Sequence, residues 1–261
     1  MLKQVRFWIG LLVGLAFLVL FLYRTDLSEM GHALAQANYI FLLPAMGAYF
    51  VAVWLRTLRW QILLAPLGRV SRGRLFPVVV IGYMANNILP VRLGELARAY
   101  LLGEKEKMSK AAVLATVLVE RLMDGVALIF FLLLTLPFLP LGRWLGDLGR
   151  PLGLSLEATQ ALFLTLSALF LGILLLLLLM VSWPGLGKGI AGLLERRLPG
   201  GWGSKGSQML LSFMGGLRVL RSPGQLLGVF LVSCLVWLAE AVMYYLITFS
   251  FQLGQPFSVL L

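Results

Sequence analysis

The sequence predicts an all-α fold: a polytopic bundle of transmembrane helices that contains a broken or re-entrant helix pair. Of the 261 residues, 60% are hydrophobic and 13% are charged, whereas soluble domains contain about 25% charged residues. Apolar runs recur along the chain at lengths close to the roughly 17–25 residues that a helix needs to cross a bilayer. These observations exclude a soluble globular enzyme, a disordered chain and a fibrous repeat.

We expect a single transmembrane domain over residues 1–261. Its expected spans lie near residues 7–23, 39–58, 125–139, 161–183 and 225–251. The first run has no small-residue cleavage site directly after it, so we interpret it as a retained anchor. A further apolar run starts at Phe257 and stops with the sequence at Leu261, so the C-terminal end is expected to be truncated.

Residues 75–90 and 111–124 form two apolar segments of a different kind. Pro77, Gly82 and Pro90 interrupt the first segment, and the second runs directly into Glu120 and neighbouring charges. Each is too short or too polar for a simple span, so we expect them to enter and return, or together to form a broken hairpin. Three full crossings between residues 74 and 140 would also be consistent with the sequence.

The distribution of basic residues predicts which connectors face the cytoplasm. Lys and Arg concentrate in the N-terminus, in residues 56–74 and in residues 184–224, and basic connectors remain on the cytoplasmic side. Residues 24–38 contain one basic and two acidic side chains, and residues 140–160 contain two of each, so both connectors are expected outside. The chain is therefore predicted to be a multi-pass protein of the cytoplasmic membrane with a cytoplasmic N-terminus. Residues 185–223 alternate apolar and basic stretches, which is typical of amphipathic helices on an anionic leaflet, although a solvated linker fits 199–207 equally well.

Several classes of function find no support in the composition. The net charge of +11 comes from residues between the apolar runs, where they set topology and meet anionic lipid, so we expect no nucleic-acid partner. A single cysteine, Cys234, and a single histidine, His32, leave no intrachain disulfide and no Cys/His zinc site. We expect no cofactor and no metal, and the sequence has no Gly-x-x-x-x-Gly-Lys-Ser/Thr loop for a nucleotide.

Charged residues gather next to the interrupted segments. They are Arg92, Glu95, Arg98, Glu120, Arg121 and Asp124. Each unpaired charge at the bilayer centre costs about 2.5–3.5 kcal/mol, so six would exceed the roughly 5–15 kcal/mol by which a protein is stable. Helical spacing predicts the pairs Glu95–Arg98 and Arg121–Asp124, and an arginine between Glu120 and Asp124. We therefore expect paired charges that line a polar cavity.

The residues around Pro90 suggest what this cavity holds. The chain breaks there and a helix restarts near Glu95, so its N-terminal amides, flanked by Arg92 and Arg98, suit a phosphate or a carboxylate. Asn86 and Asn87 add neutral donors and acceptors for hydroxyl groups. The alternative is that these residues only hold the broken hairpin together, and the two roles are compatible.

Glu240, Arg56 and Arg59 are the other charges at membrane depth. Glu240 lies in the middle of an apolar run, so we expect it to face the interior, where it either pairs with an arginine or carries a proton. Arg56 and Arg59 end the second run, and they either snorkel to the interface or line the mouth of the cavity.

At these residues the sequence resembles the membrane region of lysylphosphatidylglycerol synthase, a family of flippase-like integral membrane proteins. The motifs that resemble it are Asn-x-x-x-Pro-x-Arg-x-Gly-Glu at 86–95, Glu-Arg-x-x-Asp at 120–124, Arg-Thr-Leu-Arg-Trp at 56–60, and Trp237 with Glu240. The resemblance implies a protein that moves polar-headed lipids, phospholipids or aminoacyl lipids, between leaflets. It also implies two further helices after the last run. The soluble synthase domain of aminoacyl-transferring members is not in this sequence, so the resemblance implies a transporter and not an enzyme.

The leading hypothesis is therefore a lipid translocase whose partners are membrane lipids with an anionic or phosphate-bearing headgroup. One alternative is an intramembrane lipid-modifying enzyme that uses Glu120 or Asp124 as a general base. Another is a membrane scaffold for a separately encoded lipid synthase or glycosyltransferase. A homo-oligomer is compatible with each hypothesis.

Overall fold

The protein is an all-α membrane helix bundle. The computed structural model describes residues 14–15, 19–23, 25–88, 93–135, 146, 148–197 and 201–253, and all regular secondary structure in these ranges is helical. By length and composition, three of the described helices can cross a membrane, over Tyr39–Leu64, Leu156–Ile173 and Pro223–Ser250. The expected span at 7–23 lies mostly outside the described residues, as do 136–139 and the run that starts at Phe257.

The helices follow one another with short connections. In chain order they are α2 (Leu27–Gln36), η1 (Tyr39–Phe41), α3 (Leu42–Leu64), α4 (Arg72–Ile88), α5 (Gly94–Lys105), α6 (Lys110–Thr135), η4 (Arg150–Leu152), α8 (Leu156–Ser182), α9 (Pro184–Arg197), α10 (Trp202–Gly216), η5 (Leu217–Arg221) and α11 (Pro223–Ser250), where η marks a 3-10 helix.

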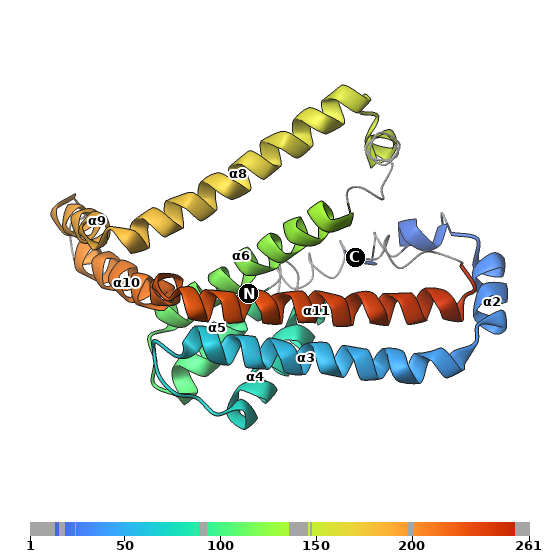
Figure 1. The fold of residues 1–261 in the computed structure, drawn as a ribbon, viewed down its shortest axis with the longest axis horizontal. Coiled ribbons are helices and arrows are strands. Elements are labelled where there is room, and N and C mark those ends of the chain that lie inside the picture. The colour runs from blue at the N-terminus through green and yellow to red at the C-terminus, as the bar shows by residue number, and fades with distance from the viewer. Residues whose placement is uncertain are drawn as a thin grey trace.

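The antiparallel pair α3 and α11 forms the long axis of the bundle, and α6 packs against both (Figure 1). Two hydrogen bonds join the end of α11 to the start of α3: Asn38 N–H donates to the Ser250 carbonyl oxygen, and Ser250 Oγ donates to the Asn38 carbonyl oxygen, both at 2.9 Å. The Asn38 side chain also caps η1 by accepting from Ile40 N–H. These bonds fix the register in which α3 and α11 lie side by side.

Helices α4 and α5 pack against each other, with residues 89–92 between them outside the described residues. The prediction instead paired residues 75–90 with residues 111–124. Pro77 and Gly82 do not interrupt the first segment, because both lie inside α4, which is one helix from Arg72 to Ile88.

Helices α4 and α5 can approach closely because glycines face each other. A Cβ at Gly94 would collide with the Gly82 carbonyl oxygen, and a Cβ at Gly82 would collide with the side chain of Arg98. The long Arg98 side chain therefore passes over Gly82 into the core.

The second interrupted segment is organised differently from the prediction. Residues 111–124 and 125–135 belong to a single helix, α6, which runs without a break for 26 residues, so the separation into a re-entrant segment 111–124 and a span starting at Gly125 is wrong. No proline interrupts this stretch, and its charged residues have partners on neighbouring helices. The helix therefore has no need to end where the charges begin.

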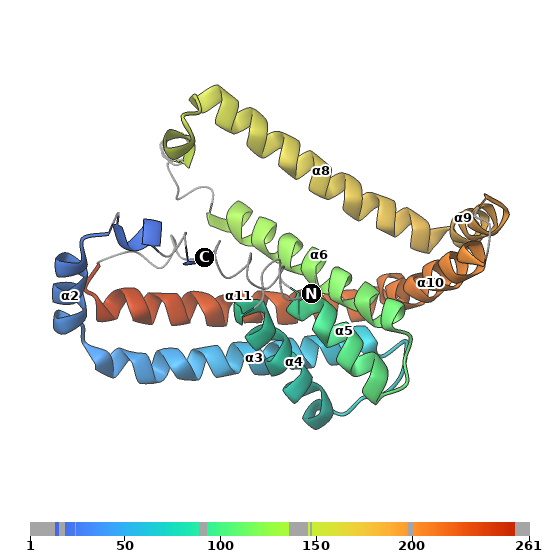
Figure 2. The same cartoon turned by 180° about the vertical axis from the view of Figure 1, so that it is seen from behind.

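Helix α8 stands apart from the rest of the bundle, and both views show its ribbon separated from that of α6 (Figures 1 and 2). The two helices meet near mid-length, where the Phe170 ring lies against Gly125. At its other end α8 leads into α9, which folds back on α10. Both α9 and α10 are helical as expected, and they carry exposed basic side chains such as Lys188, Arg197 and Lys205. Their place on a lipid surface remains a prediction.

Candidate functional site

Arg59 lies at the centre of the buried charges and joins three helices. From α3, its Nη2 donates to Glu120 Oε1 at 2.9 Å and to Asp124 Oδ2 at 3.4 Å, and its Nη1 donates to Asp124 Oδ1 and, at 2.9 Å, to Ser233 Oγ on α11. The spacing of Glu120 and Asp124 predicts an arginine between them, and Arg59 is that arginine. Its side chain is 0% exposed, so the alternative in which it snorkels to the interface is wrong.

Glu120 of α6 accepts hydrogen bonds from three arginines. Besides Arg59, Arg98 donates from Nη2 to Oε2 at 2.9 Å and from Nη1 to Oε1 at 3.3 Å, and Arg121 donates from Nη2 to Oε1 at 2.8 Å. The guanidinium of Arg98 also lies over the ring of Trp60, 4.2 Å from its centroid. A fully buried carboxylate is tolerated here because cations and hydrogen bonds compensate for its lost hydration.

Arg121 forms the outer edge of this cluster. Its Nη1 lies 3.2 Å from Asp124 Oδ2, which is the predicted i, i+3 pair, and its Nε lies 3.5 Å from Glu95 Oε1. The predicted pair Glu95–Arg98 does not form: Arg98 turns inward to Glu120, and Glu95 contacts Arg121 instead. The side chain of Arg121 is 32% exposed and that of Glu95 is 23% exposed. The buried ion network therefore reaches the protein surface at this point.

A second ion pair joins Arg56 of α3 to Glu240 of α11, with Arg56 Nη2 donating to Glu240 Oε1. Of the two alternatives for Glu240, the structure contains the pairing with an arginine. The Arg56 guanidinium also lies 4.9 Å from the centroid of the Tyr83 ring on α4. Both charged side chains are largely buried, so Arg56 also does not snorkel to the interface.

The remaining predicted site residues lie on the α4 side. Asn86 is half-buried, and its Oδ1 faces the backbone of Gly94. Asn87 is exposed. Arg92 lies outside the described residues, so the anion site expected at the start of α5 stays a prediction.

The charges of these two groups of ion pairs balance within the described residues. The four arginines Arg56, Arg59, Arg98 and Arg121 face the four carboxylates Glu95, Glu120, Asp124 and Glu240, and every one of these eight groups takes part in an ion pair. Within the described ranges no group of three His, Cys, Asp or Glu side chains is placed to hold a metal ion.

Sequence reasoning overlooked three polar neighbours of this network. Ser233 accepts from Arg59, Thr116 Oγ1 accepts from Trp60 Nε1 at 3.1 Å, and Tyr83 lies beside Arg56. Tyr83 precedes Asn86 by three residues and so shares its face of α4, a signal that was available. Ser233 and Thr116 sit in apolar runs and gave no signal.

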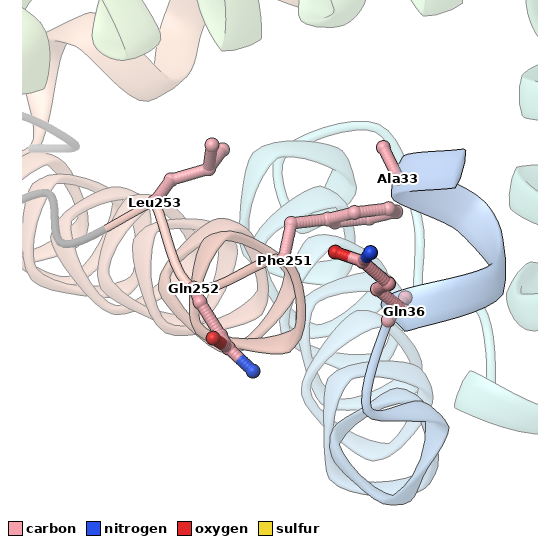
Figure 3. Close-up of a pocket in the computed structure, with 6 residues that line it drawn as sticks. Ala33, Gln36, Phe251, Gln252 and Leu253 are labelled. Carbon is pink, nitrogen blue, oxygen red and sulfur yellow. The ribbon is translucent and has the colours of Figure 1, made fainter. Parts of the chain in front are cut away.

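A separate cavity of about 250 Å³ lies where the end of α11 meets α2. It is lined by Ala33, Gln36, Ala37, Phe251, Gln252 and Leu253. Figure 3 shows the Phe251 ring and the Gln36 side chain among the residues that line this cavity. None of the predicted site residues lines it.

Comparisons with known proteins agree with the membrane architecture. The family model described as "Lysylphosphatidylglycerol synthase TM region" matches residues 7–261. A "UPF0104 membrane protein" of Methanothermobacter thermautotrophicus is 30% identical over 142 residues, which cover 52% of this chain and 42% of that protein. "UPF0104 membrane protein MJ1595" of Methanocaldococcus jannaschii is 26% identical over 139 residues, or 52% of this chain and 41% of that protein.

A third relative has a name of another kind. "Glycosyltransferase AglD" of Haloferax volcanii is 29% identical over 123 residues, which are 47% of this chain and 20% of that protein. The matches thus span less than half the length of each of these three relatives. No solved structure matches the chain.

Proposed function

This chain belongs to the lysylphosphatidylglycerol synthase TM region family, and from that premise we propose that it moves a polar-headed lipid between the leaflets of the cytoplasmic membrane. The observation that carries the proposal is the buried ion network that reaches the surface at Arg121. A headgroup that crosses hydrocarbon unaided loses its hydration at a high cost in free energy. A polar path on the protein lowers that cost, while the acyl chains remain in the surrounding lipid.

Arg121 is the side chain best placed to receive the headgroup. It faces three carboxylates, Glu95, Glu120 and Asp124, and it is the most exposed member of the network. A phosphate can therefore replace one or two of these partners while the buried contacts of Arg59 and Arg98 with Glu120 stay in place. A guanidinium can bind phosphate through two parallel hydrogen bonds, which are among the strongest that side chains make.

The helix order supports the orientation proposed for the chain. If α4 and α5 enter the membrane and return, the basic residues before α4 and those around 105–110 lie on one side. Helix α6 then crosses to the other side. This arrangement is consistent with a cytoplasmic N-terminus under the positive-inside rule.

The test is lipid exchange between leaflets in liposomes that contain the purified protein and a chain-labelled phospholipid. We expect Arg121→Gln to slow exchange about tenfold or more, because a charge-assisted hydrogen bond is worth about 1.5–3 kcal/mol. The matched control is Arg74→Gln, which removes an exposed arginine paired with Glu106 away from the network. Equal exchange rates in wild type and both variants would contradict the proposal.

A second function is favoured by one observation, the relative named as a glycosyltransferase. In this alternative the chain holds or supplies lipid for a separately encoded glycosyltransferase and does not exchange lipid alone. Copurification of a stoichiometric partner, together with no exchange by the isolated protein, would favour it. A mass change in lipid incubated with the isolated protein would instead favour a lipid-modifying enzyme.

A further inference from the structure

The α9–α10 hairpin lies at the opposite end of the bundle from α2 (Figures 1 and 2). Small residues hold it in place. A Cβ at Gly187 of α9 would collide with the Met214 side chain of α10, and a Cβ at Gly216 of α10 would collide with the Ala112 carbonyl oxygen in the first turn of α6. The eight residues of the two groups of ion pairs lie on other helices, so the proposed headgroup path does not account for this part of the chain.

One face of α10 continues past the point where it contacts α6. It carries Trp202, Lys205, Met209, Phe213 and Gly216, whose intervals of three and four residues place them along one side of the helix. Phe213 packs on the hydrophobic core and Gly216 on α6, whereas Lys205 is exposed, Met209 is 60% exposed and Trp202 is 74% exposed. The side of α10 that faces the bundle thus leaves a tryptophan and a methionine uncovered beyond the edge of α6.

Helix α9 has a similar exposed stripe. Ile190, Leu193 and Arg197 follow one another at intervals of three and four residues, and all three are exposed. Exposed apolar side chains beside basic ones are typical of helices that lie in the interface of a bilayer, where the apolar groups reach the acyl boundary. Tryptophan is enriched at that depth in membrane proteins.

The charge of the hairpin region indicates what covers these stripes. Residues 184–221 contain six basic side chains and one acidic side chain, Glu195. A second copy of the chain would bring the same excess of positive charge, and like charges that face each other across an interface are unfavourable. An anionic leaflet offers the opposite charge, and it attracts Lys and Arg side chains that lie close to its surface.

We infer that the α9–α10 hairpin is a docking surface for anionic phospholipid, on the leaflet at which α6 begins. Trp202 and Met209 enter the acyl boundary, and Lys205 and Arg197 meet the lipid phosphates. This surface is separate from the headgroup path proposed at Arg121, and its lipids bind without being moved. The inference therefore stands or fails independently of the translocase.

A spin label on α10 tests the depth of this stripe in the full chain. The native cysteine is removed by Cys234→Ala, and the label is attached to Met209→Cys in liposomes that contain phosphatidylglycerol. We expect several-fold more frequent collision with dissolved oxygen, which concentrates in hydrocarbon, than with a water-soluble nickel complex. The matched control is Ser204→Cys, at an exposed position on the opposite side of α10, where collisions with the nickel complex should dominate.

Two other outcomes would overturn the inference. Access of the nickel complex to position 209 that is as free as its access to position 204 would show a solvated hairpin. Low access of both reagents to position 209 would show that protein covers the stripe, either a second copy or another part of the chain.

The charged side chains are tested with the same label at position 209, in liposomes of phosphatidylcholine with and without phosphatidylglycerol. We expect phosphatidylglycerol to raise the ratio of oxygen to nickel collisions several-fold. The double variant Arg197→Gln/Lys205→Gln should lose most of this rise, because each basic residue near an anionic leaflet strengthens binding about fivefold. The control Arg69→Gln/Lys105→Gln removes two exposed charges outside the hairpin and should keep the rise. No rise in the chain without charge substitutions, or equal rises in the two double variants, would overturn the preference for anionic lipid.

Discussion

Helix α8 and the α3–α11 pair are all long and apolar, yet they differ in how they pack: α3 and α11 pack against each other, whereas α8 is mostly exposed. From residue 158 to residue 182 α8 has no charged side chain, and 6% of its hydrophobic window is buried, against 22% for α3 and for α11. Helices α3 and α11 lie together along their length and contribute Arg56, Arg59 and Glu240 to ion pairs. Helix α8 touches α6 in mid-length through Phe170 and Gly125.

The difference separates two roles of sequence in a membrane protein. Apolar length decides that a helix can enter the bilayer, and all three helices meet this condition. Lipid is as apolar as leucine, so hydrophobicity gives helices no reason to associate within it, and close packing and polar contacts decide which helices meet. Helix α8 has the length, but in the described part of the chain no ion pair joins it to another helix, and it stands apart.

The largest expected effect comes from removing the charge at the centre of the network. Glu120→Gln leaves Arg59 and Arg98 buried without full compensation, and breaking a buried ion pair from one side costs about 3–5 kcal/mol of stability. Thermal unfolding in detergent measures this loss. The control is Glu104→Gln, whose exposed pair with Lys110 is screened by solvent and is expected to contribute little to stability. Equal losses in the two variants would mean that the buried network does not stabilise the bundle.

The next effect is a coupling between α3 and α11. Arg56→Gln and Glu240→Gln should each destabilise the protein, and the double variant should lose less than the sum of the two, by about 0.5–3 kcal/mol. A double-mutant cycle on unfolding in detergent measures the coupling. Strict additivity would show that this pair does not hold the two helices together.

A smaller effect is expected where α6 and α8 touch. Gly125→Ala places a methyl group against the Phe170 ring, and overpacking of a well-filled contact costs about 1–3 kcal/mol. Because α8 has few other contacts with the bundle to hold it in place, we expect a loss at or below the lower limit. Adding Phe170→Leu to the Gly125→Ala variant should restore the lost stability, because the smaller side chain leaves room for the methyl group. A large loss that Phe170→Leu does not restore would indicate that α8 is fixed more firmly than its contacts imply.

The smallest effect belongs to the exposed face of α8. Leu169→Ala, at a position 60% exposed, should change stability by no more than about 0.5 kcal/mol. Leu63→Ala, at a fully buried position of α3, should cost about 2–5 kcal/mol. Similar losses at both positions would contradict the comparison and show that this face of α8 is covered by another helix or by a second copy of the chain.

The sequence allowed prediction of the parts of this fold that depend on local pattern. Apolar runs located α3, α8 and α11, and Pro90 predicted an end of α4 before a helix that restarts near Glu95, which is α5. Pro77 and Gly82, which were also expected to interrupt the segment, lie inside α4. The i, i+3 spacing predicted Arg121–Asp124 correctly, because both residues lie on one helix. The same rule was wrong for Glu95–Arg98, since Gly82 on a different helix opens the path by which Arg98 reaches Glu120.

The prediction divided helix α6 into two segments because its charged residues suggested the end of a helix. The ion-pair partners of these charged residues come from α3 and α5. Spacing within a segment cannot reveal such contacts between helices.

The most direct measurement of the central claim is the contact between Arg121 and a lipid phosphate in a bilayer. Solid-state NMR with ¹⁵N-labelled arginine can detect guanidinium nitrogens that lie next to the phosphorus of bound lipid, and subtraction of the Arg121→Gln spectrum assigns the signal. The account predicts a phosphorus contact that disappears in Arg121→Gln and persists in Arg74→Gln. A spectrum in which Arg121→Gln removes no phosphorus contact would contradict the account.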